Sequence, residues 1–286
     1  MTKLKVRHRT TFRYRETVQL GAHRLMLRPR ESCDVKLASF ELNISPNATV
    51  SWQNDVFGNT VATAAFTEMT NMLVIESVAE LMLEAAAWPV FDIAASAISF
   101  PFRYADEEWT DLGALTTPLY PDPTGQLRDW AQAFVAGDPT DTLSLLKDLC
   151  AGVPAWIQYQ SREDEGTQSP IETLDRGWGS CRDLAVLFVE AARSLGFGAR
   201  IISGYLHNPG QELAGSAETG STHAWGEVYV PGAGWITFDP TNSGVGGFNL
   251  IPVAVARDIR QAMPVIGSFS GASSAFEGMS VIVEVG

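Results

Sequence analysis

Cysteine is scarce in this chain, and its few copies are widely spaced. The 286 residues include three cysteines, which are Cys33, Cys150 and Cys181. Their number is odd and no two of them form a CxxC pair, so the sequence carries neither a disulfide framework nor a cysteine-based zinc pattern. We therefore expect a reducing compartment and no bound metal.

Long apolar runs and basic residues are also in short supply. No apolar stretch approaches the ~20 residues that span a bilayer, and the first residues, MTKLKVRHRTTFRYRE, contain no apolar signal core. The 20 Lys and Arg residues are outnumbered by 33 Asp and Glu residues, which gives a net charge of −13. Because nucleic acid and anionic lipid both bind clustered Lys and Arg, we expect no nucleic acid and no membrane as a partner. The sequence predicts a soluble cytoplasmic protein.

The first part of the chain has the alternating pattern of β-strands. Apolar and polar residues alternate in four stretches, residues 5–14, 37–44, 50–66 and 71–84. Residues 54–59 have the composition of a hairpin connection. The pattern predicts a small antiparallel β-sandwich as an N-terminal domain, residues 1–88. No chemistry is evident in it, and we expect His8 and His23 to occupy solvated strand positions.

The next segment, residues 89–123, is rich in proline and aromatic residues. Its prolines are Pro89, Pro101, Pro118, Pro121 and Pro123. Proline interrupts regular elements, while aromatic side chains favour burial. We therefore expect an ordered connector without helices or strands that lies over the domain surfaces.

The remaining residues, 124–286, mix helix and strand patterns and predict a second domain. Helical patterns cover residues 126–135, 142–158, 170–174 and 181–195. Strand patterns cover residues 200–205, 224–230, 235–238 and 280–285. Residues 207–222 have the composition of a polar loop. Ser169 and Gly196 have the residue types that begin and end helices.

Cys181 lies where the glycine-rich loop of GWGSC turns into a long apolar helix. Its sulfur should therefore lie near the unpaired N–H groups and the positive dipole of a helix N-terminus, which favour a thiolate. The same N–H groups can hold an oxyanion. The alternative is a small buried apolar residue, which is our interpretation of Cys150 and Cys33.

His223 and Asp239 are the candidate partners of this sulfur. His223 heads a strand in STHAWGEVYV, and Asp239 ends the apolar strand of GWITFDPTN one hairpin later. Adjacent strand ends lie close, so the carboxylate can accept the second imidazole N–H and fix the tautomer. The alternative for Asp239 is a turn cap before proline. His207 also follows Cys181, but it lacks the aromatic neighbour and the strand-edge setting of His223.

Three aromatic residues flank these positions. Trp178 and Trp225 either wall a substrate groove or belong to the core, and Tyr159 either supplies a hydrogen-bond donor to the site or packs in the core. The sequence contains no GxSxG elbow, no HExxH, no Walker loop and no GxGxxG after a strand. Cysteine, histidine and aspartate in that order are typical of a thiol nucleophile with its base and orienting acid.

At these residues the chain resembles the transglutaminase-like superfamily, in the bacterial form described as cysteine proteases. The resemblance rests on RGWGSCRDLAVLFVEAARSLGFGARIISGY, on THAWGEVYVPGAGWITFDPTN and on the helix that ends at Gln158-Tyr159. The β-rich start is similar to the N-terminal domain of bacterial members. The family implies an α+β fold, in which an antiparallel β-sandwich precedes a papain-like core with helices packed on an antiparallel sheet. Ser180 departs from the family pattern, since members commonly have a small or aliphatic residue there.

The resemblance also implies an activity. It makes Cys181 the nucleophile, His223 the general base and acid, and Asp239 the orienting carboxylate of an acyl transfer from an amide through a thioester. Water as acceptor gives a peptidase or amidase acting on a peptide or protein substrate, which we favour, and a primary amine gives a transglutaminase. We expect no cofactor. A non-catalytic peptide-binding protein on the same fold is the alternative from another class, and the sequence leaves the oligomeric state open.

Overall fold

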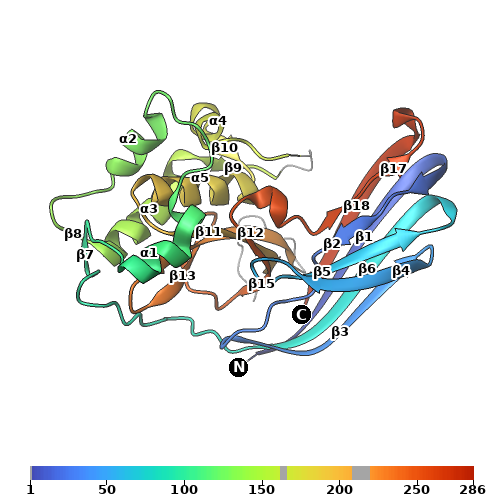
Figure 1. The fold of residues 1–286 in the computed structure, drawn as a ribbon, viewed down its shortest axis with the longest axis horizontal. Helices are drawn as coiled ribbons and strands as arrows, with labels where there is room; N and C mark the ends of the chain where they lie inside the picture. The colour runs from blue at the N-terminus through green and yellow to red at the C-terminus, as the bar shows by residue number, and fades with distance from the viewer. Residues whose placement is uncertain (1, 162–165, 208–219) are drawn as a thin grey trace.

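The computed structural model describes residues 2–161, 166–207 and 220–286. Figure 1 shows a strand-rich part on one side and a part with helices packed on a sheet on the other. The fold is α+β, as predicted, with an N-terminal sandwich and a papain-like core. None of the helices within these three ranges is long and apolar enough to cross a membrane.

The sandwich consists of two antiparallel sheets. The larger one has the order β17-β1-β6-β3, with β18 also paired to β1, and the smaller one has the order β16-β2-β5-β4. Strict alternation along β6 places one face in the core, where Leu73 and Ile75 pack against Leu25 and Ala64 of the smaller sheet. The strands are β1 (Thr2–Leu20), β2 (His23–Leu25), β3 (Val35–Ser45), β4 (Ala48–Asn54), β5 (Thr60–Phe66), β6 (Met69–Leu83), β16 (Val265–Ile266), β17 (Phe269–Ser270) and β18 (Phe276–Val285).

The last strands of the chain belong to this sandwich and not to the second domain. β18 pairs antiparallel with β1, from Val6 opposite Val285 to Tyr14 opposite Phe276. β16 pairs with β2 and β17 with β1, and Figure 1 shows the red end of the chain beside the blue beginning. The predicted extent of the second domain, residues 124–286, is therefore wrong at its C-terminal end.

The connector contains regular elements, contrary to the prediction. It holds β7 (Ser99–Phe100), helix α1 (Asp106–Leu112) and a 3-10 turn, η1 (Gly113–Thr116). The stretch between Pro101 and Pro118 leaves room for α1, whose three acidic residues in the first turn complement the positive end of the helix dipole. Phe100 and Phe102 pack against the hydrophobic core, which explains why this segment is ordered.

The core is built around α5 (Cys181–Ser194), whose middle is buried on every side. It packs against a five-stranded sheet of order β14-β13-β12-β11-β15. Gly226 allows this approach, because a Cβ at that position would lie 2.7 Å from Phe188 of α5. The strands are β11 (Ala199–Leu206), β12 (Ser221–Val230), β13 (Gly234–Asp239), β14 (Gly244–Val245) and β15 (Leu250–Ala256), the last of which the sequence pattern did not reveal.

The remaining elements lie around α5, except η3, which lies against β1 of the sandwich. They are α2 (Gln126–Gln132), β8 (Thr140–Asp141), α3 (Thr142–Trp156), β9 (Gln158–Tyr159), α4 (Pro170–Arg176), β10 (Trp178–Gly179), η2 (Ile259–Gln261) and η3 (Ser273–Ala275). The predicted helix signals hold, since the Ser169 hydroxyl accepts the N–H of Glu172 at the start of α4 and Gly196 adopts φ of +94° just after α5.

Two histidines of the sandwich are buried, which corrects the prediction of solvated positions. His8 is 1% exposed and His23 is 3% exposed. His8 lies on the face of β1 that meets the core, where its Nδ1 is 3.1 Å from the Tyr205 hydroxyl and its Nε2 is 2.9 Å from Oγ1 of Thr10. Burial lowers the pKa of His8 to about 4. Cys33, expected to be buried, is exposed.

The sandwich and the core sheet meet through a continuous apolar cluster. Val6, Val283 and Val285 of the sandwich pack with Tyr205 and Ile251 of the core.

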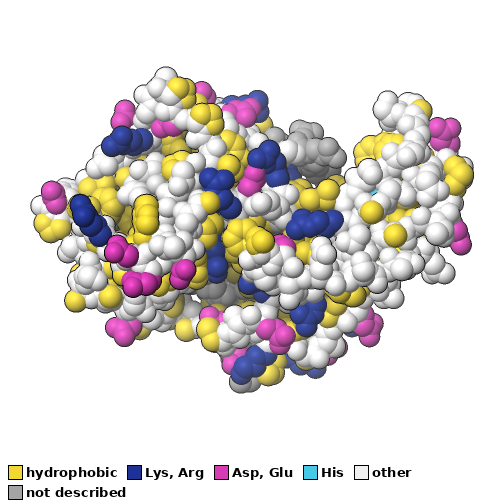
Figure 2. Space-filling view, in the orientation of Figure 1, with side chains coloured by type: hydrophobic (Ala, Val, Ile, Leu, Met, Phe, Trp, Pro, Cys, Tyr) yellow, Lys and Arg dark blue, Asp and Glu magenta, His cyan; other side chains and the backbone are white. Residues whose placement is uncertain are grey.

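Basic and acidic side chains are interspersed over the described face in Figure 2, without an extended basic patch on it.

Candidate functional site

Cys181 is the first residue of α5, and its side chain is partly exposed. Cys150, on α3, is 1% exposed and makes a long contact with the carbonyl of Gly244, 3.7 Å from its sulfur. Cys181 thus has the predicted setting at a helix N-terminus, and Cys150 has the predicted buried one.

The turn before Cys181 is held by backbone pairing and by a carboxylate. β10 runs parallel to β9, with the N–H of Gln158 donating to Gly177 at 2.8 Å and that of Gln160 donating to Gly179 at 2.9 Å. The next residue, Ser180, donates its N–H and its hydroxyl to Oδ2 of Asp183, each at 2.8 Å. These bonds fix where α5 begins and therefore where the sulfur lies.

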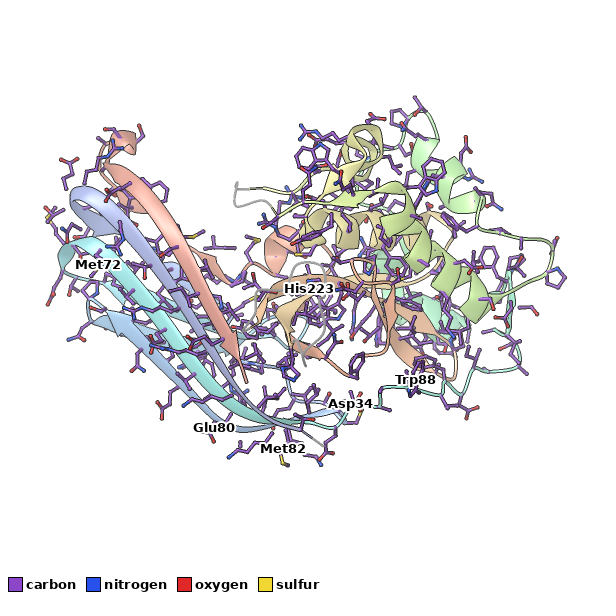
Figure 3. The ribbon with its side chains drawn as sticks, turned by 180° about the vertical axis from the view of Figure 1, so that it is seen from behind. Asp34, Met72, Glu80, Met82, Trp88 and His223 are labelled. Atoms are coloured by element: carbon purple, nitrogen blue, oxygen red, sulfur yellow. The ribbon has the colours of Figure 1, made fainter. Side chains whose placement is uncertain are left out.

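His223 and Asp239 form a buried pair on neighbouring strands of the core sheet. His223, labelled in Figure 3, is 2% exposed and Asp239 is 3% exposed. Nε2 of His223 donates to Oδ2 of Asp239 at 3.0 Å. The same oxygen accepts from Nδ2 of Asn242 at 2.8 Å, and Oδ1 accepts the N–H of Thr241 at 3.0 Å. The carboxylate therefore has donors on both oxygens and holds the imidazole in one orientation.

The electrostatics of the site favour a charged imidazole. Burial alone would lower the pKa of His223, but the charge and hydrogen bond of Asp239 outweigh it, and the sulfur of Cys181 adds to the rise. In Asp239, burial raises the pKa of the carboxyl, and His223, Asn242 and Thr241 more than offset this, so its pKa is lowered. Nδ1 of His223 is buried and has no hydrogen-bond partner among the described residues. The structure thus pairs His223 with Asp239, and the sulfur of Cys181 is close enough to raise the pKa of the imidazole.

The three predicted aromatic residues have different positions. Trp225 is 1% exposed and packs in an apolar cluster, so it does not wall a groove. Its ring stacks on that of His223, with centroids 6.1 Å apart. Trp178 is half-buried, with the Arg176 guanidinium 5.4 Å from its ring centre. Tyr159 is half-buried, and the pKa of its phenol is raised first by burial and second by the charge of Cys181.

Asp183, Thr241 and Asn242 are site residues that the sequence analysis missed. Asp183 follows Ser180 by three residues, which is the spacing of a capping box and was the available signal. Thr241 and Asn242 lie directly after the Asp239-Pro240 pair, and their contacts become visible when that turn folds back on the carboxylate.

The remaining predictions concern His207 and metal binding. His207 follows β11, where burial lowers its pKa, and Asp239 pairs with His223 instead. Most of the predicted polar loop, residues 208–219, lies outside the described residues. Within the described ranges, no three His, Cys, Asp or Glu side chains gather as a metal site.

Two family models match this chain. The model of the bacterial transglutaminase-like N-terminal region matches residues 4–81, and the model of the transglutaminase-like superfamily matches residues 128–240. The core belongs to the transglutaminase-like superfamily. This transglutaminase-like core contains Cys181, His223 and Asp239 within the matched range.

One relative of this transglutaminase-like chain extends over both domains, and another matches less than half of it. An uncharacterised protein of Mycobacterium tuberculosis strain H37Rv is 28% identical over 283 residues, covering 93% of this chain and 87% of its own length. An uncharacterised protein of Mycobacterium leprae is 33% identical over 117 residues, covering 41% of this chain and 40% of its own. The structure of a candidate cysteine protease from Cytophaga hutchinsonii is similar in fold, with a TM-score of 0.72, 19% identity and coverage of 99% and 90% of the two chains.

Proposed function

We propose that this protein catalyses cysteine-dependent acyl transfer on an amide or peptide bond of a peptide or protein substrate. The observation that supports this function best is the buried pair of His223 and Asp239, whose imidazole pKa is also raised by the sulfur of Cys181, a residue at a helix N-terminus. This arrangement supplies a base for the thiol, an acid for the leaving amine and a carboxylate that stabilises the charged imidazole.

In the proposed mechanism, Nδ1 of His223 holds the proton of Cys181, and the thiolate attacks the carbonyl carbon of the amide. The C=O π electrons move to the oxygen, which the N–H of Cys181 stabilises, with the Tyr159 hydroxyl as candidate second donor. The tetrahedral intermediate collapses, the C–N bond breaks, and the nitrogen takes the proton from His223. The products of this half-reaction are a free amine and a thioester on Cys181.

The second half-reaction releases the acyl group. Water gives up a proton to His223 and attacks the thioester carbonyl, the C–S bond breaks, and the sulfur regains its proton. This route gives an acid and makes the protein a peptidase or amidase, which is the outcome we propose. A primary amine in place of water would give a new amide, as in a transglutaminase.

Alkylation with iodoacetamide tests the activated sulfur, because the chain provides its own reference. Cys33 is exposed and lies outside the site, so it should react as an ordinary thiol, while Cys150 is buried. We expect the adduct at Cys181 to form at least tenfold faster than that at Cys33 near pH 7, and to lose this advantage in His223→Ala. Equal rates at both cysteines would favour the non-catalytic peptide-binding protein.

The acyl acceptor is tested by product mass. The protein is incubated with a peptide library, with and without a primary amine, and the products are weighed. Hydrolysis predicts fragments that gain only water, or a gain of about 1 Da for deamidation, in both samples. Incorporation of the amine would identify a transglutaminase instead. Cys181→Ala should abolish either product while the far-UV circular dichroism spectrum stays unchanged.

A further inference from the structure

Asp183 connects two separate segments of chain at the start of α5. It is completely buried. Its Oδ2 accepts the N–H and the hydroxyl of Ser180, and its Oδ1 accepts the N–H of Gln168 at 2.7 Å. Ser180 directly precedes Cys181, whereas Gln168 belongs to the segment that leads into α4.

The packing around this carboxylate leaves little freedom. A Cβ at Gly179 would lie 2.8 Å from the Cβ of Asp183 and 3.1 Å from a methyl group of Leu184. Only glycine therefore allows the strand β10 to lie this close to the helix. Gly179 also accepts the N–H of Gln160, which follows Tyr159. Asp183 thus contacts the turn that precedes the nucleophile and lies against the residue that holds the Tyr159 strand.

From this geometry we propose that Asp183 is a positioning residue, which sets the place of the Cys181 sulfur and N–H relative to His223 and Tyr159. The inference rests on the proposed function and adds a residue to it. Asp183 acts through Ser180, Gln168 and Gly179, which its described contacts connect to the turn before the nucleophile. The carboxylate acts on the geometry of the attack, so its loss should lower kcat more than it raises KM.

A carboxylate fits this place because its described partners, the N–H of Gln168 and the N–H and hydroxyl of Ser180, are all hydrogen-bond donors. Asparagine has nearly the same shape, but its NH₂ group would face either the N–H of Gln168 or the two donors of Ser180. Asp183→Asn therefore breaks at least one of the two connections without changing the volume of the side chain. Ser180→Ala removes the hydroxyl bond and keeps the backbone bonds, so it should have a smaller effect in the same direction.

The matched control is the carboxylate that caps another helix. Asp141 accepts the N–H of Ser144 at 2.8 Å at the start of α3, and its helix does not carry the nucleophile. Asp141→Asn therefore reports what the loss of a cap does to stability alone.

The experiment measures the alkylation rate of Cys181 as a function of pH, with Cys33 as internal reference. It also measures the Tm of each variant, and kcat and KM on a peptide that the protein cleaves. We expect Asp183→Asn to slow Cys181 alkylation and kcat by about tenfold to a hundredfold. Ser180→Ala should slow both a few-fold, and Asp141→Asn should lower Tm without changing either rate. If the Asp183→Asn variant has a lower Tm but keeps the wild-type kcat, Cys181 alkylation rate and pH profile, the proposal is overturned.

Two further outcomes are decisive. If Asp183→Asn does not fold, Ser180→Ala carries the test, because it keeps the carboxylate and all backbone bonds; wild-type rates in that variant would overturn the inference. If Cys181 of the wild-type protein reacts no faster than Cys33, the proposed function itself fails. That result differs from a fast wild-type sulfur that Asp183→Asn leaves unchanged.

Discussion

Acid should weaken the attachment of the sandwich to the core, because His8 is buried there as a neutral side chain. Its pKa is about 4 in the folded protein, against 6.5 for an exposed histidine, and desolvation is the cause. The groups that face it are the hydroxyls of Tyr205 and Thr10, which are uncharged at these pH values. Since the folded pKa is depressed, the unfolded chain binds the proton more readily, and stability is lost as pH falls below 6.5 towards 4.

The size of this effect follows from the two pKa values. Between pH 7 and pH 5 the unfolded side chain becomes protonated while the folded one stays neutral. With about 1.4 kcal/mol per pKa unit, the free energy of unfolding should fall by about 2 kcal/mol over this interval through His8 alone. That is a large fraction of the stability of an ordinary domain.

Urea unfolding at pH 7 and pH 5 measures the loss. His8→Gln keeps a side chain that can donate to one hydroxyl and accept from the other, but it does not titrate, so its stability should fall by about 2 kcal/mol less than that of the wild type. Tyr205→Phe is the control, because it removes one hydrogen bond and leaves His8 to titrate. Equal losses in the wild type and in His8→Gln would refute the reasoning.

Three other changes test the core and the site. Asp239→Asn should lower turnover by about 10²- to 10⁴-fold. Because this change removes the interaction that raises the pKa of His223, the alkylation of Cys181 should be fast over a narrower pH range, which is measured as the alkylation rate against pH. Gly226→Ala places a Cβ against Phe188 and should lower the free energy of unfolding by about 1–3 kcal/mol, measured in urea. Arg193→Met leaves the buried Glu190 without the cation that lies 2.5 Å away, and thermal unfolding should show a loss of about 3–5 kcal/mol.

The sequence predicted the elements whose signals are local. Alternation in β3 and β6, the cap at Ser169 and the glycine-rich turn before Cys181 each depend on neighbouring residues, so their patterns can be read directly. The pairing of His223 with Asp239 and the place of Cys181 at a helix N-terminus were also predicted, because each of the three residues ends or begins a recognisable element.

The sequence did not show which faces of those elements would be covered. His8 and Trp225 lie on strand faces that became buried when the second domain or the adjacent strands packed on them, and Cys33 lies in an exposed bend. The pairing of β18 with β1 joins opposite ends of the chain, and no local pattern specifies a contact of that kind. Asp183 was overlooked since its role depends on the segment around Gln168, which is distant in sequence.

The pairing of β1 with β18 also has a consequence for biosynthesis. β1 is synthesised long before β18, the strand that pairs with one of its edges. Until β18 is made, this hydrogen-bonding edge is open to other chains, which makes an interrupted translation product prone to aggregate. A closed sandwich is therefore a sign that the polypeptide was synthesised through to Val285.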